Sequence, residues 1–164
     1  MMRQLGILLT LTVAGGAWAC SNQAETSRSS GGTWLPADDP ERDAAIERHF
    51  RGFDMAMVET GYRFTELYWA GVDQNWPYAA YQAEKIRTAI ENGLERRPAR
   101  AASAGPFLDE VLPAVVRTIE ARDSAGFRTN FGSLTGACNS CHAAESMEFV
   151  VVTIPTDRLA PVGS

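Results

Sequence analysis

The fold is decided by residues 127–142, which read FRTNFGSLTGACNSCH. Apolar side chains recur in this stretch at steps of three and four residues, which places them on one face of an α-helix. The residues of that face are Phe127, Phe131, Leu134, Cys138 and Cys141. Asp123 and Ser124 stand just before the stretch and are typical helix caps. The sequence therefore predicts a helix that begins after Asp123-Ser124 and buries this face.

Two earlier stretches have the same spacing of apolar residues. The first begins after Asp39-Pro40-Glu41 and ends at Ala70-Gly71. Its apolar positions are Ile46, Phe50, Phe53, Met57, Phe64 and Tyr68, with Gly61 in the gap. Asn75 caps the second, which ends before Pro98. The apolar positions of the second are Ala79, Ala83, Ile86, Ile90 and Leu94.

The third stretch opens at Pro106 and completes a set of four helices. Pro113 lies inside it, and we expect this proline to kink the helix or to cost it about 3 kcal/mol. Its apolar positions are Leu108, Val111, Leu112, Val115 and Ile119. Residues 96–105 are expected to be the longest internal loop. Because short connections make neighbouring helices antiparallel, the sequence predicts an all-α fold, an antiparallel up-down-up-down four-helix bundle.

Residues 1–19 have the composition of a signal peptide. Their apolar run is about ten residues long, shorter than the ~20 that span a bilayer. Ordinary cleavage after Ala19 and processing as a bacterial lipoprotein both leave Cys20 first in the mature chain, and a cysteine at this point favours a lipid anchor on it. Residues 20–42 are rich in Ser, Gly, Asp and Pro and predict a flexible tether. The folded domain is expected to span residues 43–164.

The composition narrows the classes of function. The chain has 164 residues and a formal charge of −5 at pH 7. This acidic excess excludes a non-specific nucleic-acid binder, which needs a basic face. There are only two histidines, His49 and His142, and three cysteines. A cage of several histidines and a disulfide-rich scaffold are therefore excluded as well.

The chemistry lies in the pentapeptide Cys138-Asn139-Ser140-Cys141-His142. Two thiols on one side of a helical turn can add to the two vinyl groups of a haem, and the histidine that follows can turn its imidazole onto the iron. We therefore expect one covalently attached haem, haem c. Cys138 and Cys141 would form its thioethers, and His142 would be the proximal ligand of the iron.

Two other uses of these cysteines are less consistent with the rest of the chain. A thiol–disulfide redox pair usually begins a helix after a strand, and no such pattern surrounds Cys138. A structural zinc ion needs four ligands. Beyond His142 the chain offers only Cys20, at the end of the tether, and His49.

The pentapeptide at the end of the fourth helix resembles that of the class II, or cytochrome c′-like, cytochromes. Four segments look like those of a group of small exported bacterial monohaem proteins whose role is largely unassigned: Leu67–Gly71, Asn75–Pro77, Ala79–Tyr81 and Leu134–Ala143. The similarity covers about residues 45–155, the whole predicted domain. It implies the bundle fold, ligation of iron by His142, and attachment of the haem outside the cytoplasm. Class II relatives often pair through their first two helices, which implies a homodimer.

The resemblance leaves the sixth position of the iron either empty or filled by a methionine of the first helix. Each helical residue advances 100°, so Met57 lies on the apolar stripe and Met55 lies on the outer face. Gly61, four residues after Met57, leaves a gap against which a flat ring can pack. Met57 is therefore the favoured distal ligand. An empty or water-filled site and ligation by His49 stay open as alternatives.

After His142, residues 149–155 form a continuous apolar and β-branched run. Because a lone strand has no partner in a helical bundle, we expect an extended C-terminal tail laid over the haem edge or across a helix groove.

Together these features predict an exported, periplasmic monohaem c-type cytochrome that carries electrons for an unidentified redox partner protein. Its contact with a membrane would be through a lipid on Cys20 alone. The alternative is a five-coordinate haem module that binds nitric oxide, carbon monoxide or a similar gas. A peroxidase-like enzyme is a weaker alternative, for which His49 is the only distal histidine on offer. Since no nucleophile–base pair or phosphate loop can be identified, we do not expect an enzyme.

Overall fold

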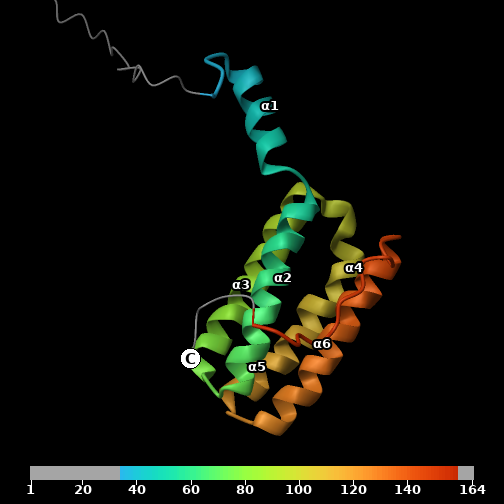
Figure 1. Cartoon of the computed structure of the whole chain (residues 1–164). Helices are drawn as coiled ribbons and strands as arrows, with labels where there is room; N and C mark the ends of the chain where they lie inside the picture. The colour runs from blue at the N-terminus through green and yellow to red at the C-terminus, as the bar shows by residue number, and fades with distance from the viewer. Residues whose placement is uncertain (1–33, 159–164) are drawn as a thin grey trace, which may run out of the picture. The chain divides into compact units, whose positions relative to one another are not determined.

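Figure 1 shows the computed structural model, which describes residues 34–158. Within that range there is no strand, and four helical segments pack against each other. They are α2 (Phe53–Val72), α3 (Trp76–Arg96), the series from α4 (Ala101–Pro106) to α5 (Leu112–Glu120), and α6 (Ser124–Ala144). The predicted all-α, four-helix architecture is confirmed. No helix in the described part of the chain is long and apolar enough to cross a membrane.

The predicted signal peptide, Cys20 and most of the predicted tether lie outside the described residues. A further helix, α1 (Asp39–Phe50), begins within the last four residues of that tether. Asp38 caps it by accepting a hydrogen bond from the backbone N–H of Glu41.

The prediction of one continuous first helix is wrong, because the chain breaks between α1 and α2. Arg51 has a φ of 59°, outside the helical region, and Gly52 caps α2. Asp54 holds this break in place. Its carboxylate accepts a hydrogen bond from the N–H of Gly52 at 3.0 Å and pairs with the guanidinium of Arg51. Phe50, expected in the core, is consequently exposed.

The predictions for α3 and α6 are confirmed together with their caps. The side chain of Asn75 accepts a hydrogen bond from the N–H of Tyr78, at 3.3 Å. The side chain of Asp123 accepts from the N–H groups of Ala125 and Gly126, at 3.1 and 3.0 Å. These bonds satisfy donors that a helix start otherwise leaves unpaired.

The predicted loop over residues 96–105 is also wrong. A short 3₁₀ turn (Pro98–Arg100) leads into α4, and the chain stays helical to the end of α5. The alanine-rich composition explains this, since alanine has the highest helix propensity. Just before Pro113 the helix widens into the π-helical segment η2 (Phe107–Val111). A π-turn at this point relieves the clash that a proline ring makes with the preceding turn.

Aromatic side chains fill the core where α2 packs against α6. The ring centre of Phe131 lies 4.6 Å from that of Phe64 and 5.0 Å from that of Tyr68. A Cβ atom on Gly71 would lie 2.1 Å from the ring of Phe127. The C-terminal part of α2 therefore faces the N-terminal part of α6.

Burial falls off toward the other end of the same interface. Leu67 on α2, and Phe131 and Leu134 on α6, are almost completely buried. Met57 on α2 and Cys138 on α6 pack against the same core but are only partly buried. The less tightly closed end of the α2–α6 interface is thus the end that holds the cysteines.

The close approach at Gly71 gives a stability prediction. We expect Gly71→Ala to lower the free energy of unfolding by about 1–3 kcal/mol, because the added methyl group overlaps Phe127. Denaturant unfolding measures the change. Gly132→Ala on α6 is the matched control: a Cβ there meets nothing within 4 Å, so stability should stay the same or rise by up to about 1 kcal/mol. Equal stabilities of the two variants would contradict the packing described here.

Candidate functional site

The pentapeptide occupies the last turns of α6. The helix continues through Ala144, so Cys138 and Cys141 lie on the same side of it, three residues apart. Both thiols are free and both side chains are partly buried. His142 follows directly and is also partly buried. The structure thus brings together the three residues that the sequence singled out.

The end of α6 is anchored to the α4 region of the chain. Arg100 Nη1 lies 3.0 Å from a carboxylate oxygen of Glu145, and the hydroxyl of Ser103 donates a hydrogen bond to the same carboxylate. These contacts hold the turn that follows His142 against a neighbouring helix.

The environment of Cys138 is apolar enough to suppress ionisation. Burial raises the pKa of its thiol from 9.0 to about 12, and the nearby Cys141 adds a smaller effect in the same direction. Thiol–disulfide enzymes need the opposite, an attacking cysteine with a lowered pKa. This environment therefore counts against a thiol–disulfide redox pair.

The raised pKa predicts slow alkylation of Cys138 in haem-free chains for as long as they keep the fold described here, before loss of the haem unfolds them. At pH 8 the thiolate fraction of Cys138 should be about a thousandth of that at pH 11, since each pH unit changes it tenfold. Mass spectrometry after timed iodoacetamide treatment would measure the rate, with Cys141 in the same peptide as the internal comparison. Because the folded pKa is raised, Cys138 contributes stability below pH 9 that is lost as the pH rises toward 12. Faster labelling at Cys138 than at Cys141 would contradict this assignment.

The imidazole of His142 is oriented by a backbone carbonyl. Its Nδ1 lies 2.7 Å from the oxygen of Val150. A carbonyl only accepts hydrogen bonds, so Nδ1 carries the proton and donates it. In the neutral ring this leaves the lone pair on Nε2, the arrangement that iron-ligating histidines adopt.

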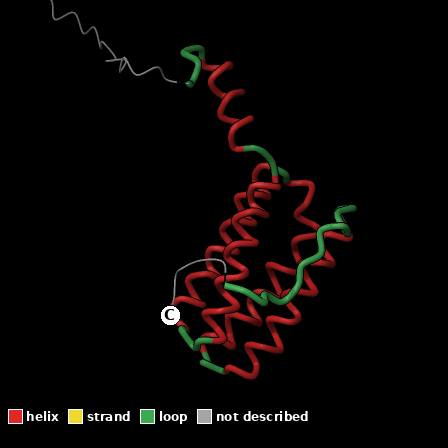
Figure 2. Tube along the Cα trace, in the orientation of Figure 1, coloured by secondary structure: helices red, strands yellow, loops and turns green. Residues whose placement is uncertain are grey.

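Val150 belongs to the C-terminal tail, Met147–Arg158, which has no regular secondary structure. Figure 2 shows the tail as a loop that turns back along α6 and continues toward α2. The side chain of Asn139 joins it to α6 with two hydrogen bonds to Val152: the amide donates to the carbonyl at 2.9 Å, and the amide oxygen accepts from the N–H at 2.8 Å. The tail therefore lies directly against the pentapeptide.

The far end of the tail is tied to α2. The indole N–H of Trp69 donates to the carbonyl of Asp157 at 3.1 Å. Both terminal nitrogens of Arg158 lie 2.7 Å from the carboxylate oxygens of Asp73, and its guanidinium lies over the Trp69 ring. The tail thus spans from α6 to the end of α2.

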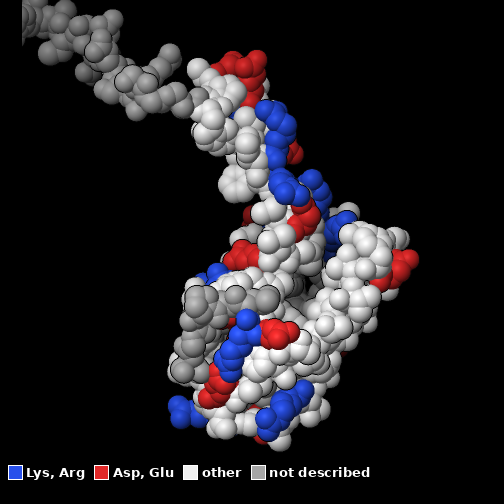
Figure 3. All heavy atoms as spheres, in the orientation of Figure 1, with Lys and Arg blue, Asp and Glu red and all other residues white. Residues whose placement is uncertain are grey.

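The part of α2 that extends toward the cysteines contains an unfilled position. The register set by Gly71–Phe127 and Phe64–Phe131 brings Gly61 and then Met57 toward the cysteine end of α6. Gly61 lies on the same helix face as buried Phe64, yet it is exposed, and a Cβ on it would meet nothing within 4 Å. In Figure 3 the surface is hollowed between α2 and the α4–α6 side of the bundle. The face of α2 that carries Met57 thus has open space at Gly61.

Met57 and Met55 differ in burial, as their positions on the helix predict. Met57 packs against the core cluster, whereas Met55 is 38% exposed. The sequence placed His49 and Met57 on one continuous helix, and this is wrong: His49 belongs to α1, which ends at Phe50, and Met57 belongs to α2.

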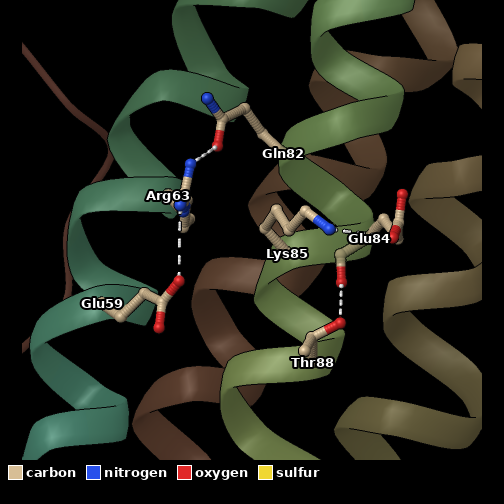
Figure 4. Close-up of polar contacts among 6 residues, drawn as sticks. All are labelled: Glu59, Arg63, Gln82, Glu84, Lys85 and Thr88. Carbon is tan, nitrogen blue, oxygen red and sulfur yellow. Dashed lines mark hydrogen bonds and ion pairs between the residues drawn. The ribbon is translucent and has the colours of Figure 1, made fainter.

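Lys85 and Met147 are less suited than Met57 to a site between α2 and α6. The ammonium group of Lys85 lies 3.1 Å from a carboxylate oxygen of Glu84, its neighbour on α3 (Figure 4), and over the ring of Tyr81. Met147 follows the end of α6 and is exposed. Within residues 34–158, no group of three His, Cys, Asp or Glu side chains is arranged to hold a metal ion by itself.

Sequence reasoning missed Asn139 and the carbonyl of Val150. The apolar run after residue 148 indicates an extended segment but does not say where that segment binds. Asn139 lies thirteen residues before its partner, and nothing in local spacing signals such a contact.

Comparisons of this chain with models of protein families, with curated proteins and with solved structures find no match.

Proposed function

We propose that this protein is an exported monohaem c-type cytochrome of the class II kind, and that it carries electrons. One observation carries most of the proposal. His142 donates from Nδ1 to a backbone carbonyl, immediately after two free cysteines on one helix face. A histidine held in this way presents Nε2 to a metal.

Each residue has a separate task in this proposal. Thioethers at Cys138 and Cys141 would fix the ring, and Nε2 of His142 would bind the iron on one side. Met57, partly buried against the core, would supply a sulfur on the other side. When bound, haem c supplies a metal centre that exchanges one electron. The packed aromatic side chains of α2 and α6 would exclude water from its edge.

The bundle in this proposal has the antiparallel up-down-up-down order of the class II cytochromes. An electron carrier takes one electron from a donor protein and passes it to an acceptor protein, so the net change over a cycle is zero. The proposal includes a periplasmic location, a lipid on Cys20, and pairing of two chains through α2 and α3. The redox partner protein is unidentified.

A gas-binding haem module is the second candidate, and the open space at Gly61 favours it. A small diatomic ligand needs a vacant sixth position and an apolar pocket beside it. If Met57 only packs, the missing side chain at Gly61 would leave room for a small ligand beside the iron. The peroxidase-like alternative has less support, because His49 is not on the helix that carries Met57.

Absorption spectra of the purified protein, oxidised and reduced, with and without carbon monoxide, test the proposal. A carrier with two protein ligands gives a low-spin spectrum in both states and binds carbon monoxide slowly or not at all. A gas-binding module gives a high-spin spectrum and binds carbon monoxide at once. Protein that shows no haem absorption after expression with a haem-attachment system would contradict both candidates.

A further inference from the structure

We propose that Asn139 is a positioning residue for the iron ligand His142 and acts through the C-terminal tail. The inference rests on the proposed haem site. Asn139 has no contact with iron in this scheme; it holds the tail so that the carbonyl of Val150 stays against Nδ1 of His142. The tail then sets the strength of the proximal ligand and, with it, the reduction potential.

The geometry supports a two-point attachment between α6 and the tail. Asn139 and His142 are three residues apart on the helix, a rise of about 4.5 Å. Their partners, Val152 and Val150, are two residues apart on the tail, and in an extended chain alternate carbonyls point to the same side at a spacing of about 6.6 Å. One stretch of tail can therefore reach both side chains, with its numbering running opposite to that of α6.

Asn139 makes the stronger of the two attachments. Its amide satisfies both the N–H and the C=O of Val152, at 2.8 and 2.9 Å. Neighbouring strands of a sheet pair their backbones in the same way. His142 makes one bond, at 2.7 Å to Val150. Loss of the Asn139 pair would remove both hydrogen bonds of Val152. The middle of the tail would then be held by the His142–Val150 bond, by the turn bond from the Val150 N–H to the Met147 carbonyl, and by the packing of Val152 against the core.

The bond to Val150 has an electronic consequence. A hydrogen bond accepted from Nδ1–H makes Nε2 a better electron donor and fixes the orientation of the ring. A stronger donor favours the ferric state over the ferrous state. Weakening the bond should therefore favour the ferrous state and raise the reduction potential.

The test compares Asn139→Ala with two matched controls on the same helix. Ser140→Ala changes the other variable position of the pentapeptide, whose hydroxyl bonds only to the Gly136 carbonyl of its own helix. Asn130→Ala removes an asparagine whose amide donates to the helical carbonyl of Gly126. Redox titration of holoprotein measures the potential. NMR of His142 measures how fast its Nδ1–H exchanges with solvent, a quantity that does not depend on redox activity.

We expect Asn139→Ala to shift the ferrous-to-ferric equilibrium about tenfold toward ferrous iron, about 59 mV for one electron. Exchange of the Nδ1–H should also become at least about tenfold faster, the lower end of the roughly 10–100-fold effects that outer-shell changes have on metal affinity or activity. Both controls should leave both quantities unchanged. Asn139→Asp keeps the acceptor for the Val152 N–H. Its reduction potential and exchange rate should therefore lie between those of the wild type and those of Asn139→Ala.

Val152→Pro removes the N–H that donates to Asn139, this time by changing the tail. It replaces Asn139→Ala in the test if that variant incorporates haem poorly. It should raise the potential in the same direction. The inference is overturned, and the proposed function stands, if the wild type contains haem but neither Asn139→Ala nor Val152→Pro changes the potential or the exchange rate. Wild type without haem would overturn the proposed function and, with it, the inference.

Discussion

Replacing both Cys138 and Cys141 with alanine should abolish covalent haem and remove most of the helix signal. The ring would fill the end of the α2–α6 interface where Met57 and Cys138 are only partly buried. Losing one buried phenylalanine side chain costs about 3–5 kcal/mol, and a haem is several times larger. That loss is comparable with the whole stability of an ordinary domain, about 5–15 kcal/mol. The domain should therefore unfold.

Haem staining on a denaturing gel and far-ultraviolet circular dichroism measure the two effects. Cys20→Ala is the matched control, because it removes the remaining cysteine of the chain without touching the pentapeptide. It should keep the stain and the helix signal. A stain that survives the double replacement would show that the attachment site lies elsewhere.

Met57→Ala should convert a low-spin, carbon monoxide-resistant protein into a high-spin protein that binds carbon monoxide at once. A thioether sulfur at the sixth position fills the site and favours the ferrous state. Removing it opens the iron, so the change of spin state should be complete rather than partial. Oxidised wild type should also show the weak long-wavelength band of a ferric haem bound by sulfur.

Met55→Ala is the matched control for this prediction. Met55 and Met57 are on the same helix, α2, but Met55 is 38% exposed and Met57 packs against the core. The control should change neither the spin state nor the binding of carbon monoxide. A wild type that is already high-spin would show that Met57 does not bind the iron, and it would favour the gas-binding candidate.

Local patterns in the sequence predicted α3 and α6 well. Asn75 and Asp123 use their side chains as the sequence suggests, and the apolar stripe of α6 is buried at Phe127, Phe131 and Leu134. In these helices the cap, the helical period and the burial all agree, which is the condition under which sequence patterns are most informative.

Two features of the fold could not be predicted from the sequence, because local structure there departs from what the apolar pattern indicates. The break at Arg51 depends on Asp54, whose side chain accepts a hydrogen bond from the N–H of Gly52. This contact interrupts the helix although the apolar residues continue at helical spacing. Residues 101–106 form a helix, although the stretch 96–105, rich in arginine and alanine and without an apolar stripe, looks like a loop.

Only part of the candidate site was visible in the sequence. The pentapeptide and the separation of Met55 from Met57 follow from short-range spacing. The carbonyl that orients His142 comes from Val150, and the pairing of Asn139 with Val152 joins a helix to an irregular tail. Contacts of this kind are set by how the tail folds back, which no periodicity encodes.

The mass of one peptide tests the central claim most directly. Trypsin cleaves after Arg128 and Arg158 and releases residues 129–158, which contain Cys138, Cys141 and His142 but not Cys20. After expression with a haem-attachment system, this peptide should carry the added mass of one haem, and fragmentation should assign both thioethers to the two cysteines. A peptide of unmodified mass with two alkylatable thiols would contradict the account.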